Sequence, residues 1–422
     1  MTAAAVDLPP SELERLRRRT HRSLIAGVAL GSTANIAAST VATIAAGQIA
    51  GSTAWSGTPG AAIVLGAALG SVLLSQLMVR SGRRTGLAAG YALGALGGLV
   101  ATAAVMTGSL PVLLIGTTLI GFGNASSQLS RYVAADLYPP ARRASALGLV
   151  VWGATIGAIV GPNLVAPAAD VAVRIGLPRL SGAFLLPVLF VGAAWAVAVV
   201  FLRPDPYALA DASSRHDDPA GDRSTPASLA AVLARPNVPV AIVALVTVQF
   251  VMVLVMTITP VHMTAHGHDL AAVGIVISGH TLGMYALSPV SGRLTDRFSA
   301  VPVILAGLTV TGSASVLAAV APPDGGVLLF LALFLLGYGW NLGYVAGSAL
   351  LTQGLSLRER TRLQGVTDGL IWSSAVVASL GSGVVLAAAS YAALGLLGAA
   401  VVVIPAGLVV ARRSVVEGAG RA

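Results

Sequence analysis

Apolar runs of about 20 residues recur along this 422-residue chain, separated by short polar or glycine- and proline-rich breaks. An α-helix of ~20 apolar residues is long enough to cross a lipid bilayer. Only 10% of the residues are charged, against about 25% in an average soluble domain. Together these features exclude an ordinary water-soluble protein and predict an all-α integral membrane protein.

We predict twelve transmembrane helices, six in each half of the chain. They cover approximately residues 22–50, 60–79, 85–107, 111–135, 143–167, 182–203, 237–260, 271–290, 301–321, 327–350, 365–388 and 390–411. The predicted domains are an N-terminal tail (1–21), a six-helix bundle (22–203), a linker (204–236), a second six-helix bundle (237–411) and a C-terminal tail (412–422). The linker is rich in Asp, Ser, Pro and Arg, which favours a flexible connection.

All 25 basic residues are arginine, and the chain has no cysteine. In the predicted topology only Arg174 and Arg179 lie on the face opposite the termini, and Arg131 lies inside a span. The positive-inside rule therefore predicts a multi-pass protein of the cytoplasmic membrane with both termini cytoplasmic. The arginines form no single stripe or face, which argues against a nucleic-acid partner. Without cysteine or lysine there is no disulfide, thiolate metal site or Walker-type phosphate loop, and we predict no metal and no cofactor.

The two halves of the chain are related by an internal repeat. Shifting the second half by 217 residues aligns similar positions: Arg80 with Arg297, Asn124 with Asn341, Arg143 with Arg360, and Gly148 with Gly365. Several distant matches at one offset indicate duplicated units. We therefore predict two pseudo-symmetric six-helix bundles, an arrangement typical of secondary transporters.

The loops after the second and eighth spans resemble the signature loop of the major facilitator superfamily. The second copy, Gly292-Arg-Leu-Thr-Asp296-Arg297, keeps the acidic residue, whereas the first has Val79 in its place. Asp136 to Arg143, after the fourth span, also resembles the family's turn there. The resemblance implies that these loops act as a conformational latch, made of Arg80, Gly82, Arg83, Arg84, Gly292, Asp296 and Arg297.

The fifth span contains three glycines four residues apart followed by a proline: Gly153, Gly157, Gly161 and Pro162. Small residues at this spacing let membrane helices pack closely, and such ladders also occur in proteins that transport nothing. The stretch resembles the Gly-x-x-x-Gly-Pro signature of the superfamily's proton-coupled exporters. Leu164 and Val165 replace the usual trailing glycines of that signature.

Polar residues inside the spans form stripes along single helix faces. Asn124, Ser127, Gln128 and Arg131 are spaced to share one face, and the first span has a similar stripe around Asn35. In the family, the helices that carry these stripes line the central cavity. The expected substrate-binding residues are Asn35, Asn124, Gln128, Arg131, Gln249, Met252, Met256, Trp340, Asn341 and Tyr344. The alternatives are that the stripes join helices by hydrogen bonds and that Arg131 extends toward the membrane surface.

Histidine and aspartate are the candidates for proton coupling. His280 lies midway along the eighth span and is the leading candidate, with Asp368 second. The alternative for His280 is a packed neutral ring bonded to a carbonyl. His262, His266 and His268 lie at the end of the seventh span without a confirming metal-ligand spacing, and a solvated loop is favoured over a zinc site.

These features predict a secondary active transporter, not an enzyme. We expect a monomer that moves a small amphipathic molecule across the bilayer by alternating access, with proton-coupled efflux favoured. An uptake symporter or a facilitator is the alternative. An integral-membrane transferase is disfavoured because the sequence has neither a Gly-x-Ser-x-Gly nor a His-Glu-x-x-His motif.

Overall fold

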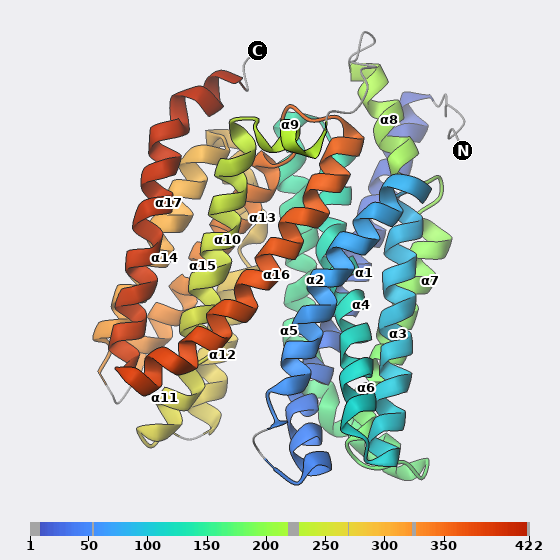
Figure 1. The fold of residues 1–422 in the computed structure, drawn as a ribbon. Helices are drawn as coiled ribbons and strands as arrows, with labels where there is room; N and C mark the ends of the chain where they lie inside the picture. Colours follow the sequence, from blue (N-terminus) through green and yellow to red (C-terminus); the bar gives the residue numbers. More distant parts are fainter. Residues whose placement is uncertain (1–8, 53–54, 218–227, 269, 323–325, 420–422) are drawn as a thin grey trace. The chain divides into compact units, whose positions relative to one another are not determined.

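The computed structural model describes residues 9–52, 55–217, 228–268, 270–322 and 326–419. In these ranges it contains 12 helical segments that are long and apolar enough to cross a membrane. The ribbon in Figure 1 consists of helices throughout the described ranges. The prediction of an all-α protein with twelve spans is confirmed.

The first six spans are made of seven helices. They are α1 (Pro10–Ala50), α2 (Thr58–Ser81), α3 (Arg83–Thr107), α4 (Leu110–Asp136), α5 (Arg143–Arg174), α6 (Ser181–Leu186) and α7 (Gly192–Phe201). A single π-helical turn, Pro187–Val191, joins α6 to α7 and makes them one span. Such turns are usually short bulges within an α-helix.

The second six spans are made of eight helices. They are α10 (Asn237–Met256), α11 (Thr259–Ala265), α12 (Leu270–Tyr285), α13 (Ser288–Phe298), α14 (Ala300–Val320), α15 (Gly326–Leu350), α16 (Leu357–Ala388) and α17 (Tyr391–Ala419). Breaks divide α10 from α11 and α12 from α13, and a proline stands in the first turn after each break. Proline has no N–H and clashes with the preceding helical turn, so a new helix begins there.

Several helix boundaries differ from the predicted ones. α1 begins at Pro10 and is continuous for 41 residues, so its first turns precede the predicted span. α16 begins at Leu357 because Ser356 and Glu359 form a capping box. The predicted flexible linker contains two helices, α8 (Pro206–Asp217) and α9 (Leu229–Leu233). Leu209 and Ala210 of α8 are buried, so apolar packing orders this part of the linker.

The chain divides into two compact units, each of which combines distant segments. Unit 1 contains residues 1–139, 153–225 and 361–372, and unit 2 contains residues 140–152, 226–360 and 373–422. The first turns of α5 therefore belong to unit 2, and an early part of α16 belongs to unit 1. Each of these two helices passes through both units.

Equivalent contacts in the two units reveal the repeat. In unit 2, a methyl group added at Gly148 would clash with the carbonyl oxygen of Ser288. In unit 1, a methyl group at Gly365 would lie 2.6 Å from the carbonyl oxygen of Ser71. Both pairs are related by the 217-residue offset found in the sequence. The duplicated sequence therefore forms duplicated packing, in which a small residue lets two helix backbones approach closely.

Candidate functional site

A buried ion pair joins α4 to the α16 segment of unit 1. The guanidinium of Arg131 donates to Asp368 Oδ1 at 2.6 Å, and the two side chains are 1% and 2% exposed. The Tyr132 hydroxyl accepts from Arg131 at 2.9 Å and donates to the same Asp368 oxygen at 3.1 Å. A second Arg131 nitrogen donates to the Gln128 carbonyl at 2.6 Å. The guanidinium is therefore bound by protein groups, and the Asp368 carboxylate is its ion-pair partner.

A second buried arginine also holds this segment. Arg83, in the first turn of α3, pairs with Asp136 at the end of α4. The same guanidinium nitrogen donates to Gln364 Oε1 at 2.8 Å. A carboxylate at the C-terminus of a helix opposes the helix dipole, and the pairing with Arg83 offsets this unfavourable placement of Asp136. Arg80, by contrast, is exposed.

Close glycine packing completes the attachment of residues 361–372 to unit 1. Gly365 lies against Ser75, and a methyl group at Gly369 would lie 2.9 Å from Val72 Cγ2. The α16 segment is thus held by backbone contact with α2, by the Arg83 hydrogen bond and by the buried Asp368 ion pair. Asp368 lies where a change in its charge would act directly on this attachment.

The polar stripe of unit 1 lies where α1 packs against α4. A methyl group at Gly31 of α1 would clash with the Ser127 hydroxyl of α4. Asn35 follows Gly31 by one turn and Asn124 precedes Ser127 by about one turn, so antiparallel helices place the two asparagines at a similar level. Asn35 Oδ1 is buried without a hydrogen-bond partner among the described residues. Gln128, on the same face, is half-buried.

The glycine ladder of α5 packs along α1. Methyl groups at Gly153, Gly157 and Gly161 would lie within 2.5 to 2.9 Å of α1 backbone atoms. Pro162 follows inside the helix. The ladder therefore has a structural use as a close helix contact, whatever its role in transport.

An acidic residue outside the signature loop caps α3. Gly82 has a φ of +93°, and a side chain there would collide with the Asp205 carboxylate. Asp205 accepts hydrogen bonds from the backbone N–H groups of Arg83 at 3.1 Å and Arg84 at 3.0 Å. A carboxylate at a helix N-terminus binds unpaired N–H groups and stabilises the helix dipole. Asp205 thereby positions the helix turn that carries Arg83.

The loop of unit 2 uses its own aspartate differently. Asp296 accepts from the backbone N–H groups of Ala144 at 3.1 Å and Ser145 at 2.9 Å, so it caps the first turn of α5. A methyl group at Gly292 would lie 2.6 Å from the Ala144 carbonyl oxygen. Arg297 lies over the ring of Phe298, 5.2 Å from its centre. In the repeat, α16 is equivalent to α5, and Val79 is equivalent to Asp296. Because α16 is capped by its own capping box, its first turn does not require an acidic residue at position 79.

Aromatic rings and one glutamine form a cluster in unit 2. Trp340 and Tyr344 stack with ring centres 4.3 Å apart, and Tyr285 meets Trp340 edge-on at 5.9 Å. The indole N–H donates to Gln249 Oε1 at 2.8 Å. Met252 is buried and Met256 half-buried on the same helix as Gln249. This aromatic cluster, defined as Gln249, Tyr285, Trp340 and Tyr344, provides flat apolar surface next to a fixed amide.

Asn341 lies beside the break between α12 and α13. Its amide nitrogen donates to the Met284 carbonyl and to Ser288 Oγ, each at 2.6 Å, and its oxygen accepts from Ser291 at 2.5 Å. These bonds satisfy backbone and hydroxyl groups at the broken helix. They favour the alternative that Asn341 joins helices. Asn124, the residue that the repeat aligns with Asn341, is half-buried.

The histidines have different surroundings. His280 is 2% exposed, and its Nδ1 lies 2.8 Å from the Leu333 carbonyl, as in the packed neutral alternative. His262 stacks on Tyr391 with ring centres 4.2 Å apart and lies 4.4 Å from the His266 ring. Within the described ranges, no group of three or more His, Asp or Glu side chains is arranged to hold a metal ion.

The sequence indicates Arg131 and Asp368 separately, the first for substrate binding and the second for proton coupling, and gives no sign of Tyr132, Gln364 or Asp205. The available signal for the pair was energetic, because an arginine and an aspartate inside a membrane each need an opposite charge. No sequence spacing indicates that residues 237 positions apart are partners.

Comparison with known proteins identifies the family. The family model described as Major Facilitator Superfamily matches residues 23–277 and 240–420. The chain is 36% identical over 389 residues to the protein named "Uncharacterized MFS-type transporter YdeG" of Bacillus subtilis, covering 92% of this chain and 90% of that one. It is 30% identical over 325 residues to the riboflavin transporter RfnT of Brucella anthropi, covering 76% and 77%.

Solved structures share the fold at low sequence identity. The human organic anion transporter MFSD10 superposes with a TM-score of 0.74 at 16% identity, covering 95% of this chain and 100% of that one. A bacterial homologue of the iron transporter ferroportin, in an outward-facing state, superposes with a TM-score of 0.71 at 15% identity, covering 94% and 99%. With the family model and close relatives spanning most of its length, this multi-pass membrane protein belongs to the major facilitator superfamily and is a secondary transporter, not an enzyme.

Proposed function

We propose that the protein couples proton movement to the export of a small amphipathic molecule with a planar aromatic part. The coupling proposal is based on the buried Arg131–Asp368 pair. The Asp368 side chain is 2% exposed, and its ion pair attaches the α16 segment to α4. Protonation of Asp368 neutralises the carboxylate that pairs with the buried Arg131 guanidinium. An unpaired buried charge is strongly unfavourable.

Proton binding therefore weakens the attachment of residues 361–372 and favours a state in which Arg131 reaches water or an anionic group. Deprotonation restores the pair. This is a two-state element whose equilibrium depends on one proton, as coupling requires. Asp368 replaces His280 as the leading proton site in this proposal, because the His280 ring is held on the Leu333 carbonyl.

The substrate class is supported by the aromatic cluster of unit 2. Tryptophan and tyrosine rings bind planar apolar groups by stacking, and their polar atoms select orientation. Trp340 and Tyr344 are only 3% and 4% exposed, so a substrate reaches their faces only in another state of the cycle. Asn35, Asn124 and Gln128 remain the proposed polar contacts of unit 1.

Export is favoured by the α5 stretch from Gly153 to Pro162, which resembles the exporter signature. The alternative is proton-linked uptake. One relative is named a riboflavin transporter, and the flat ring system of riboflavin would suit the aromatic cluster in either direction of transport. The two candidates differ in direction and share the proton step.

The test uses purified protein in sealed liposomes with riboflavin and a planar cationic dye as probes. An imposed pH gradient should drive substrate movement opposite to the proton flow for export by exchange, and in the same direction for proton-linked uptake. Asp368→Asn should abolish gradient-driven movement while exchange of labelled for unlabelled substrate continues. The control is Asp170→Asn, an exposed carboxylate in unit 1. Unchanged gradient-driven flux in Asp368→Asn would refute the coupling proposal.

A further inference from the structure

A groove on unit 1 lies between the first turns of α1 and the end of α7. These two helices pack against each other, and the groove between them has a volume of about 660 Å³. Its wall on α1 contains four arginines: Arg15, Arg18, Arg19 and Arg22. Their spacing places all four on one helix face. The groove is in the size range of small-molecule sites in proteins.

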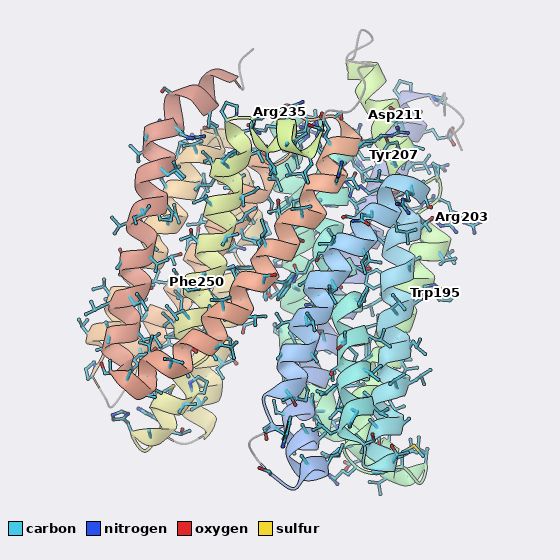
Figure 2. The ribbon with its side chains drawn as sticks, in the orientation of Figure 1. Trp195, Arg203, Tyr207, Asp211, Arg235 and Phe250 are labelled. Carbon is cyan, nitrogen blue, oxygen red and sulfur yellow. The ribbon has the colours of Figure 1, made fainter. Side chains whose placement is uncertain are left out.

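The groove changes from charged to apolar along its length. One turn beyond Arg22 the α1 wall continues with Ala26, and the opposite wall consists of Val197 and Phe201 of α7. Phe201 is 47% exposed although it lies in a membrane span. Figure 2 shows Trp195 on the same helix and Arg203 where α7 ends, and Trp195 is 44% exposed. The apolar half of the groove is therefore open to the surroundings of the span.

The charges of the groove are incompletely balanced. Glu12 lies 3.8 Å from Arg15, and Glu14 bonds to Arg18 at 2.7 Å. Arg19 donates to the backbone carbonyl oxygen of Arg203. A carbonyl oxygen is uncharged, so this bond does not neutralise the guanidinium. Among the residues described, neither Arg19 nor Arg22 has a carboxylate partner. Two guanidinium groups thus remain for an external anion, next to an apolar channel.

We propose that this groove binds one anionic phospholipid of the bilayer. The lipid phosphate contacts Arg19 and Arg22, which bind phosphate oxygens through paired N–H donors. An acyl chain lies along Ala26, Val197 and Phe201. A basic recess between helices at the membrane surface is the known form of a lipid head-group site. The apolar half selects a lipid over a water-soluble phosphate, because only a lipid fills both parts.

The experiment measures lipid retention by native mass spectrometry of the full chain, titrated with dioleoylphosphatidylglycerol or dioleoylphosphatidylcholine. Each arginine near an anionic head group contributes roughly a fivefold gain in affinity. The double variant Arg19→Gln/Arg22→Gln should therefore bind phosphatidylglycerol about 25-fold more weakly. The matched control, Arg358→Gln/Arg362→Gln, removes two exposed arginines from α16 and should stay within twofold of the parent.

Two further measurements separate the lipid from other anions. Salt should reduce the preference of the parent protein for phosphatidylglycerol, since screening shortens electrostatic range from about 10 Å at 0.1 M to about 3 Å at 1 M. Glycerol 3-phosphate should displace the lipid poorly. Phe201→Asn should weaken the binding of phosphatidylglycerol and leave the binding of glycerol 3-phosphate unchanged.

The proposal is overturned by any of three results. The first is equal affinity of the parent for the two lipids. The second is unchanged phosphatidylglycerol affinity in the Arg19/Arg22 variant. The third is displacement by glycerol 3-phosphate at lipid-like concentration, which would indicate a site for a free anion. Because the parent alone is sufficient for the first and third comparisons, failure of a variant to fold leaves the proposal testable.

Discussion

Removing either partner of the Arg131–Asp368 pair should destabilise the protein far more than removing both. Asp368→Asn removes the carboxylate that pairs with Arg131, whose side chain is 1% exposed in this state. Breaking a buried pair in this way costs about 3–5 kcal/mol, because an uncompensated charge remains. Arg131→Gln should cost a similar amount, since it leaves the Asp368 carboxylate buried.

The double variant Arg131→Gln/Asp368→Asn contains two neutral amides in place of two charges. Neutral amides need hydrogen bonds but do not require a counter-charge, so the loss is smaller. The coupling energy between the two sites should be at least about 3 kcal/mol, at the upper end of the range for contacting residues in one network. Tyr132 bonds to both partners and remains available to the amides.

The assay is reversible unfolding in mixed detergent micelles, with parent, single and double variants compared in one thermodynamic cycle. The exposed pair Arg179–Asp170 is the matched control, with an N···O distance of 3.2 Å and side chains 65% and 55% exposed. Its cycle should give less than about 1 kcal/mol, since exposed pairs are screened by water. If the Arg131–Asp368 free energies add within about 0.5 kcal/mol, the two charges are independent and the reasoning fails.

Three further predictions concern caps and close packing. Asp296→Asn should slow transport and lower stability by about 1 kcal/mol through loss of the charged cap, whereas Val79→Asn should change both little; equal transport rates in the two variants would contradict this. Asp205→Ala should cost about 1–2 kcal/mol in unfolding free energy, and an unchanged unfolding midpoint would show that its two hydrogen bonds contribute nothing. Gly157→Ala should destabilise by about 1–3 kcal/mol through overpacking, because the added methyl group would lie 2.5 Å from an α1 nitrogen. Gly383→Ala, which meets no atom within 4 Å, should be neutral or stabilising by up to about 1 kcal/mol, and the same sign in both glycine variants would count against the packing argument.

The sequence by itself determined the class of fold, the twelve spans and the repeat. Each span is a local property, since about 20 consecutive apolar residues are favourable in a bilayer whatever their neighbours are. The repeat is also readable from one string, and the match of Gly148 with Gly365 corresponds to equivalent contacts in the two units. The signature loops identified the family before any contact was known.

Only the tertiary structure decided which polar groups are partners. Arg131 and Asp368 are 237 residues apart, and Arg83 and Gln364 are 281 apart. Helical periodicity places a side chain on a face but does not say which helix covers that face. For the same reason, the sequence does not reveal that the Asn341 amide joins α15 to the break between α12 and α13.

The exchange of segments between the units was equally absent from the sequence. The hydropathy pattern predicts that the two halves are divided at the linker. In the structure, residues 140–152 belong to unit 2 and residues 361–372 belong to unit 1. Asp205 illustrates the consequence, because it lies in the predicted linker and yet caps α3. Hydrophobicity depends on the residues of one segment, whereas a charge inside a membrane is stabilised by whichever distant residue reaches it, and only the folded chain determines that residue.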